Sequence, residues 1–139
     1  MLVDDNYDDN FIHDRLIKKN DAADIVITKQ SAMEALKYLK SRKDDSIPPS
    51  PPDLIFLDIN MPGMNGWEFL QEYKKIDKQF QSRAVVVMLS TSDNPDDKMK
   101  AKFSSGVSDF KTKPLTREML QDVIAKFFSD WQFYGSNPK

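Results

Sequence analysis

The sequence contains no cysteine, no long hydrophobic run and no excess of positive charge, and each absence excludes a class of protein. Without cysteine the chain cannot form disulfide bonds, thiolate nucleophiles or cysteine-based zinc sites. No apolar stretch approaches the ~20 residues that a membrane-spanning helix needs. A net charge of −2 gives no reason to expect nucleic acid binding, which depends on a concentrated basic surface. No signal peptide fits the acidic start of the chain, so we expect a cytoplasmic protein without membrane or nucleic acid partners.

The length of 139 residues is that of one domain, which would bury about two-thirds of the surface of its unfolded chain. With 40% hydrophobic and 30% charged residues, the composition is that of an ordinary globular protein. We expect a single domain over residues 1–139, with its core in residues 1–129 and a C-terminal tail in residues 130–139.

The chain is organised around residues 53–66, which read DLIFLDINMPGMNG. The unbroken apolar run Leu54–Leu57 is typical of a central parallel strand that is buried on both faces. Asp58 ends this run, and a polar loop with two glycines follows it. Because ligands bind at the carboxyl ends of the strands in an open parallel sheet, we expect Asp58 to face a binding crevice.

Apolar runs and helical periodicities alternate along the rest of the chain. We expect strands over residues 1–3, 25–27, 54–57, 84–89 and 107–112, and helices over about 9–19, 32–39, 67–75, 95–105 and 117–128. Short right-handed crossovers turn this alternation into an α/β fold, a doubly wound (βα)5 three-layer sandwich whose parallel five-stranded sheet has the order 2-1-3-4-5. The last strand is polar enough for an edge of the sheet.

The first helix carries several local expectations. Its apolar stripe is expected to comprise Phe11, Ile12, Leu16 and Ile17. Asp8, Asp9 and Asn10 are expected only to cap the helix. His13, the single histidine, is expected at the surface or its boundary, without a functional role.

Acidic residues end two strands that this topology places side by side. Asp4 and Asp5 follow the first strand, which flanks the third strand and Asp58 where the winding of the sheet reverses. Three carboxylates so close would raise one another's pKa values, and a divalent cation would relieve their repulsion. A site with only oxygen ligands and open water positions favours Mg²⁺.

Two further strand ends supply polar side chains at the same end of the sheet. Ser90 follows residues 84–89, and its hydroxyl can donate a hydrogen bond there. Thr91 is the alternative, although successive side chains of a strand point to opposite faces. Lys113 follows the last strand, and its flexible ammonium group would pair with Asp58.

The run Asp58-Ile59-Asn60-Met61-Pro62, followed by Asn65-Gly66, resembles the phosphoacceptor segment of the response regulator receiver domain. Across nearly the whole chain, the acidic pair, the hydroxyl and the Lys113-Pro114 dipeptide occur in the order of that family. The resemblance implies a flavodoxin-like fold and assigns further roles. It implies that Asp58 is the phosphoacceptor, that Lys113 pairs first with Asp58 and then with a phosphoryl oxygen, and that the Ser90 hydroxyl donates to another phosphoryl oxygen. It further implies direct metal binding by Asp5 and Asp58, a water-mediated part for Asp4, a backbone-carbonyl ligand from Asn60, a switch formed by Ser90 and Phe110, and a cis bond between Lys113 and Pro114.

The resemblance implies a stand-alone response regulator of a two-component phosphorelay. It would take a phosphoryl group from a sensor histidine kinase or a histidine phosphotransfer protein, change shape and signal to a downstream protein. Such a domain is not an enzyme with a separate substrate, since it catalyses only its own phosphorylation and dephosphorylation. The tail residues Trp131, Phe133 and Tyr134 are expected either to cover the domain's own surface or to pair with a partner, a second copy of the chain included.

Two other classes of function are weighed against this interpretation. An aspartate-nucleophile phosphatase of the haloacid dehalogenase kind has a second aspartate two residues after its nucleophile, where this chain has Asn60. A receiver-shaped interaction domain that does not take phosphate typically lacks one of the acids or the lysine. This chain has all of the acids and the lysine.

Overall fold

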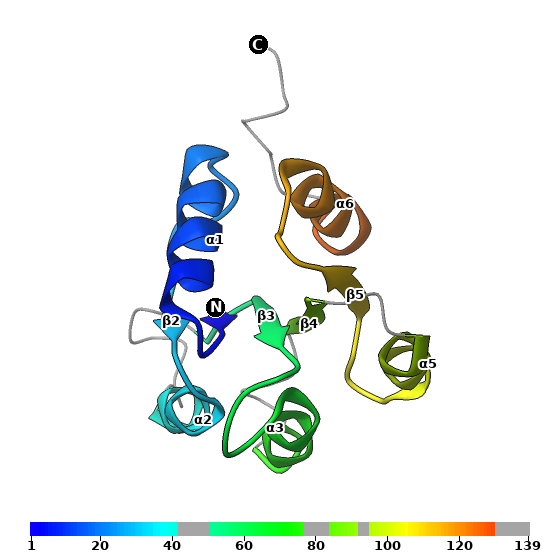
Figure 1. Ribbon diagram of the computed structural model, residues 1–139. Helices are drawn as coiled ribbons and strands as arrows, with labels where there is room; N and C mark the ends of the chain where they lie inside the picture. The colour runs from blue at the N-terminus through cyan, green and yellow to red at the C-terminus, as the bar shows by residue number, and fades with distance from the viewer. Residues whose placement is uncertain (42–50, 77–83, 92–94, 130–139) are drawn as a thin grey trace.

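The computed structural model describes residues 1–41, 51–76, 84–91 and 95–129. Strands and helices alternate along these residues (Figure 1). The elements are β1 (Leu2–Val3), α1 (Tyr7–Lys19), β2 (Thr28–Lys29), α2 (Ala32–Ser41), β3 (Leu54–Asp58), α3 (Gly66–Tyr73), β4 (Val85–Ser90), α5 (Pro95–Phe103), β5 (Asp109–Thr112) and α6 (Arg117–Phe127). The expectation for the tail residues Trp131, Phe133 and Tyr134 lies outside the described residues.

The strands form one parallel sheet in the order β2-β1-β3-β4-β5, which confirms the predicted topology. Figure 1 shows helices α1 and α6 on one face of the sheet and helices α2, α3 and α5 on the other. Strand β5 lies at the edge, as its polar sequence predicts. The doubly wound arrangement therefore places the carboxyl ends of β1 and β3 next to each other.

Side chains of the central strand β3 alternate between two hydrophobic cores. Ile55 and Leu57 pack in the core under α2 and α3, whereas Phe56 packs with α1 and α6. This alternation has the two-residue period of an extended strand, and it explains why the run Leu54–Leu57 contains no polar residue. The two cores hold β3 and Asp58 firmly in the middle of the molecule.

The second strand differs from its prediction. The structure has β2 at Thr28–Lys29 rather than at residues 25–27. Strand β1 begins at Leu2 and pairs Leu2 with Thr28, so Ile25 and Val26 extend past its first residue. The Leu2 amide still donates to the Ile27 carbonyl at 2.8 Å, but Ile25 is 55% exposed. Hydrophobicity correctly marked this segment as near the sheet, and the short neighbour β1 determines which residues pair.

Helix α1 begins earlier than predicted, and its buried face agrees with the prediction only in part. Asn6 is its N-cap, since the Asn6 side chain accepts a hydrogen bond from the Asp9 amide. The predicted caps Asp8 and Asp9 lie in the first turn, and Asn10 is buried inside the helix. Phe11 and Ile12, predicted to face the core, are 49% and 53% exposed. The buried face consists of Asn10, His13 and Ile17. The prediction is confirmed for Ile17 and for Leu16, which packs against the core, and wrong for Phe11 and Ile12, because two of the three buried residues are polar.

Candidate functional site

The site lies where strands β1 and β3 end. Asp4 follows β1 and Asp58 is the last residue of β3, and both side chains are buried. Asp5 is exposed beside them. One carboxylate oxygen from each of these residues, called here the acidic cluster (Asp4, Asp5 and Asp58), lies within 4.8 Å of the others. The structure therefore brings together the three acids that the sequence predicted as neighbours.

Two asparagines hold the turn that carries the acidic cluster. The Asn6 amide donates to Asp4 Oδ1 at 3.0 Å. The Asn10 side chain donates to the backbone carbonyls of Asp4, at 2.9 Å, and of Lys29, at 3.2 Å. Asn10 thus fastens the start of α1 to β1 and β2, a positioning role that the capping interpretation missed. Its place on the same helix face as Ile17, about two turns earlier, was a signal that could have identified it.

Lys113 reaches into the acidic cluster from the segment after β5. Its Nζ atom lies 2.6 Å from Asp4 Oδ2 and 3.3 Å from Asp58 Oδ1. It also donates a hydrogen bond of 3.0 Å to Asp9 Oδ2 on α1. The lysine side chain is only 8% exposed, so these contacts are shielded from solvent screening. The peptide bond between Lys113 and Pro114 is cis.

Burial and charge alter the protonation of both central groups. Burial and the negative charge of Asp4 raise the pKa of Asp58 to about 7, against the opposing effect of Lys113. Burial alone would lower the pKa of Lys113. Hydrogen bonds to Asp4 and Asp9, with the charge of Asp58, outweigh that effect and raise its pKa above the usual range. Lys113 is therefore a permanent cation, whereas Asp58 changes charge near neutral pH.

The predicted hydroxyl and aromatic lie on the neighbouring strands. Ser90 is the last residue of β4 and is fully buried, and its backbone carbonyl accepts a hydrogen bond of 2.7 Å from the Lys113 amide. Thr91, the alternative, is exposed. Phe110 is half-buried on β5, where it pairs with Met88 and packs against the core under α2 and α3. Ser90 and Lys113 are thus tied together by the backbone at the carboxyl end of the sheet.

Gly66 lies close to the backbone of Asp58 and Ile59, and this contact shapes the loop after Asp58. The Gly66 amide donates to the Ile59 carbonyl at 2.8 Å. Asn65 and Glu68 form a reciprocal capping box at the start of α3, with bonds of 2.9 and 3.0 Å. Asn60 lies exposed at the beginning of this loop. The loop therefore turns sharply back to Asp58 and leaves Asn60 at the rim of the site.

His13 occupies an unexpected place, since only 2% of it is exposed. Its Nε2 atom accepts a hydrogen bond of 3.2 Å from the Leu115 amide, two residues after Lys113. Burial lowers the pKa of His13, which favours the neutral imidazole that this bond requires. The prediction of a surface residue was wrong, because a lone histidine between apolar positions gives no sign of a partner 102 residues away.

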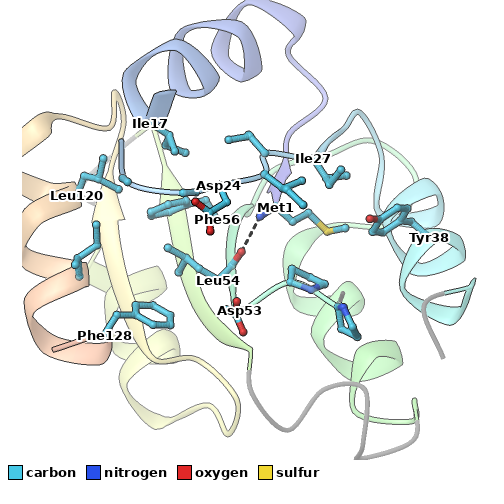
Figure 2. Close-up of a pocket in the computed structure, with 17 residues that line it drawn as sticks. Met1, Ile17, Asp24, Ile27, Tyr38, Asp53, Leu54, Phe56, Leu120 and Phe128 are labelled. Carbon is cyan, nitrogen blue, oxygen red and sulfur yellow. Dashed lines mark hydrogen bonds between the residues drawn. The ribbon is translucent and has the colours of Figure 1, made fainter. Parts of the chain in front are cut away.

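An apolar pocket lies elsewhere in the described part of the chain. It holds about 320 Å³ and is lined by residues such as Ile17, Asp53, Phe56 and Leu120 (Figure 2). The Met1 ammonium group lies there and donates to the Leu54 carbonyl at 2.7 Å. Burial lowers the pKa of this group to about 5. Because Leu54 begins β3 and Asp58 ends it, this pocket opens at the opposite end of the strand and contributes nothing to the acidic cluster.

The residues of the acidic cluster suit a hard divalent cation. They offer only carboxylate oxygens, the ligands that Mg²⁺ prefers, and one of them remains exposed to water. A buried ammonium group beside them would in turn attract an anion such as a phosphoryl group. The arrangement can thus hold a cation and an anionic group next to the same carboxylate, Asp58.

Comparisons with known proteins agree with this geometry. Residues 1–125 match the family model of the response regulator receiver domain. The chain is 31% identical to the two-component response regulator ARR17 of Arabidopsis thaliana, a match that covers 88% of this chain and 78% of that protein. It is 29% identical to the hybrid signal transduction histidine kinase L of Dictyostelium discoideum, over 91% of this chain. The chain spans only 7% of that kinase, and 12% of the histidine kinase CKI1 of Arabidopsis thaliana.

Solved structures are similar over the same extent. A two component response regulator from Cytophaga hutchinsonii superposes with a TM-score of 0.82 at 30% identity, covering 92% of this chain and 94% of that one. The receiver domain of CKI1 from Arabidopsis thaliana, complexed with Mg²⁺ and BeF₃⁻, gives a TM-score of 0.77 at 26% identity, covering 92% of this chain and 87% of that one.

Among the described residues, no helix combines the length and the hydrophobicity that spanning a membrane requires.

Proposed function

The chain belongs to the response regulator receiver domain family, and we propose that its Asp58 accepts a phosphoryl group from a phosphohistidine. The donor would be a sensor histidine kinase or a histidine phosphotransfer protein of the cytoplasm. One observation carries the proposal: Asp4, Asp5, Asp58 and Lys113 converge at the carboxyl end of β3. The whole would act as a switch that signals to a downstream protein.

In the proposed reaction a carboxylate oxygen of Asp58 forms a bond to phosphorus while the bond from phosphorus to the histidine nitrogen breaks. The electron pair of the broken bond stays on that nitrogen, and Asp58 becomes an acyl phosphate. Asp4, Asp5, Asp58 and the backbone carbonyl of Asn60 would hold Mg²⁺, which when bound lowers the repulsion between the two anions. The Mg²⁺ and BeF₃⁻ complex of the CKI1 receiver domain supports this choice of metal.

The signal would be a shift between two conformations of the site. Lys113 already contacts Asp58 and would move its ammonium group to a phosphoryl oxygen. The Ser90 hydroxyl would donate to a second phosphoryl oxygen, and half-buried Phe110 would turn inward behind it. Phosphorylation stabilises the conformation in which these contacts form, so its population rises.

Incubation with acetyl phosphate and Mg²⁺ tests the proposal against the alternatives. We expect each chain to gain one phosphoryl group, measured by intact mass spectrometry, and to lose it again on removal of the donor. An enzyme such as a phosphatase would instead release phosphate over many turnovers without a lasting adduct. A binding-only domain would gain no mass at all, and either result would contradict the proposal.

Binding of Mg²⁺ should weaken as the pH falls. With its pKa raised to about 7, Asp58 holds a proton below that pH, and a cation has to displace this proton to bind the carboxylate. We expect the association constant to fall about tenfold between pH 8 and pH 6, as calorimetric titration would measure. In the variant Asp58→Asn this dependence should disappear. An affinity that is constant across this range in the original protein would contradict the assignment of Asp58 as a ligand.

A further inference from the structure

Three carboxylates surround the Lys113 ammonium group, and one of them does not belong to the acidic cluster. Asp4 and Asp58 are members of that cluster, whereas Asp9 projects from the first turn of α1. The Lys113–Asp9 hydrogen bond of 3.0 Å joins two residues that lie 104 positions apart. Neither the periodicity of α1 nor its caps required such a contact.

The three partners of Lys113 would respond differently to a bound cation. A divalent ion at Asp4, Asp5 and Asp58 repels the ammonium group and takes over the carboxylates that Lys113 contacts at 2.6 and 3.3 Å. Among the described residues, Asp9 is the carboxylate that contacts Lys113 from outside the cluster. It can therefore keep the lysine in a charge-assisted hydrogen bond while the cluster holds a cation.

Helix α1 is built to keep Asp9 in this position. The Asp9 amide donates to Asn6 at the cap, which fixes the first turn. One turn later His13 accepts the Leu115 amide, so α1 holds the backbone of the segment that carries Lys113. Residues 9 and 13 lie on one face of the helix, four positions apart. Two successive turns thus bind the side chain of residue 113 and the backbone of residue 115.

We infer that Asp9 is a positioning residue, which retains Lys113 at the rim of the acidic cluster when a divalent cation binds there. Without Asp9, the ammonium group has only Asp4 and Asp58 as carboxylate partners and competes with the cation for them. The inference rests on the proposed metal site and deepens it, because it assigns to α1 a part in the exchange between lysine and cation. Asp9 acts through Lys113 and does not itself contact the metal.

Calorimetric Mg²⁺ titration of Asp9→Asn, with Asp8→Asn as the matched control, tests this inference. Both variants remove one negative charge from the first turn of α1, but Asp8 is exposed, and the described carboxylates that contact Lys113 are those of Asp4, Asp9 and Asp58. We expect Asp9→Asn to weaken Mg²⁺ binding about fivefold or more, as for loss of a charge-assisted hydrogen bond, and Asp8→Asn less than about twofold. Equal losses in the two variants would overturn the inference.

Repeating both substitutions in a Lys113→Gln background separates positioning from simple charge. With the ammonium group gone, Asp9→Asn and Asp8→Asn should change Mg²⁺ affinity equally. A loss specific to Asp9→Asn that persists in this background would show that Asp9 acts on the cation directly, and would overturn the inference.

A double-mutant cycle in the metal-free protein makes the test independent of the metal. Urea unfolding of Asp9→Asn, Lys113→Gln and the double variant should show that the two residues are coupled by about threefold or more in the unfolding constant. The corresponding cycle of Asp8→Asn with Lys113→Gln should show no coupling. If Asp9 and Lys113 are not coupled and the original protein still binds Mg²⁺, the inferred role of Asp9 is overturned but the proposed metal site is not. Absence of saturable Mg²⁺ binding in the original protein would overturn the proposed metal site, and the role of Asp9 in cation exchange with it.

Discussion

Replacing Asp58 by asparagine is expected to abolish phosphoryl incorporation from acetyl phosphate. The substitution retains the shape of the side chain but removes the charged oxygen that would form the bond to phosphorus. Because covalent capture depends on this nucleophile, we expect a loss of about a thousandfold or more in the rate, seen as no mass increase. Intact mass spectrometry after incubation with acetyl phosphate and Mg²⁺ measures the outcome.

The same strand offers a matched control for this variant. Asp53 precedes the first residue of β3, near the Met1 ammonium group and at the opposite end from Asp58. Asp53→Asn should therefore take up a phosphoryl group at the original rate. Circular dichroism would verify that both variants are folded. Undiminished phosphorylation of Asp58→Asn, on Asp4, Ser90 or any other residue, would contradict the assigned phosphoacceptor.

The sequence was sufficient to predict the order of the strands, because its central strands are stable in only one kind of place in the fold. An unbroken apolar run such as Leu54–Leu57 can be stable only between two covering layers, and the structure has one core on each side of it. A polar residue at the carboxyl end of such a strand then lies where the carboxyl ends of the parallel strands meet. Asp58 and Ser90 were identified in this way, and they end neighbouring strands β3 and β4.

The contacts of α1 could not be predicted in the same way. Periodicity ranks residues by hydrophobicity, so it favoured Phe11 and Ile12 over Asn10 and His13 as the buried face. The structure buries the polar pair because backbone groups of distant segments satisfy them: the carbonyls of Asp4 and Lys29, and the amide of Leu115. Partners so remote in sequence become visible only when the fold is known.

A second large effect is expected from replacing Gly66, which lies next to the site, by alanine. A methyl group added at Gly66 would lie 2.7 Å from the Asp58 carbonyl oxygen and 3.0 Å from the Ile59 Cα atom. Both are backbone atoms of the segment that carries the phosphoacceptor, so neither can move without displacing it. We expect Gly66→Ala to lower the free energy of unfolding by about 2–3 kcal/mol, the upper part of the range for overpacking in a core. Urea unfolding would measure this loss.

Gly63 provides the matched control, because it differs from Gly66 in the cause of strain. Its φ of +77° is unfavourable for alanine, but a methyl group there meets nothing within 4 Å. Gly63→Ala should thus cost only about 1 kcal/mol, from the left-handed backbone. The two variants should also differ in their rate of phosphorylation. In Gly66→Ala the displaced Asp58 backbone should slow phosphorylation by more than the loss of stability explains. Gly63→Ala should keep the original rate. If Gly66→Ala were as stable as the original protein, the loop would have to be less rigidly held against Asp58 than the capping box and the Gly66–Ile59 hydrogen bond indicate.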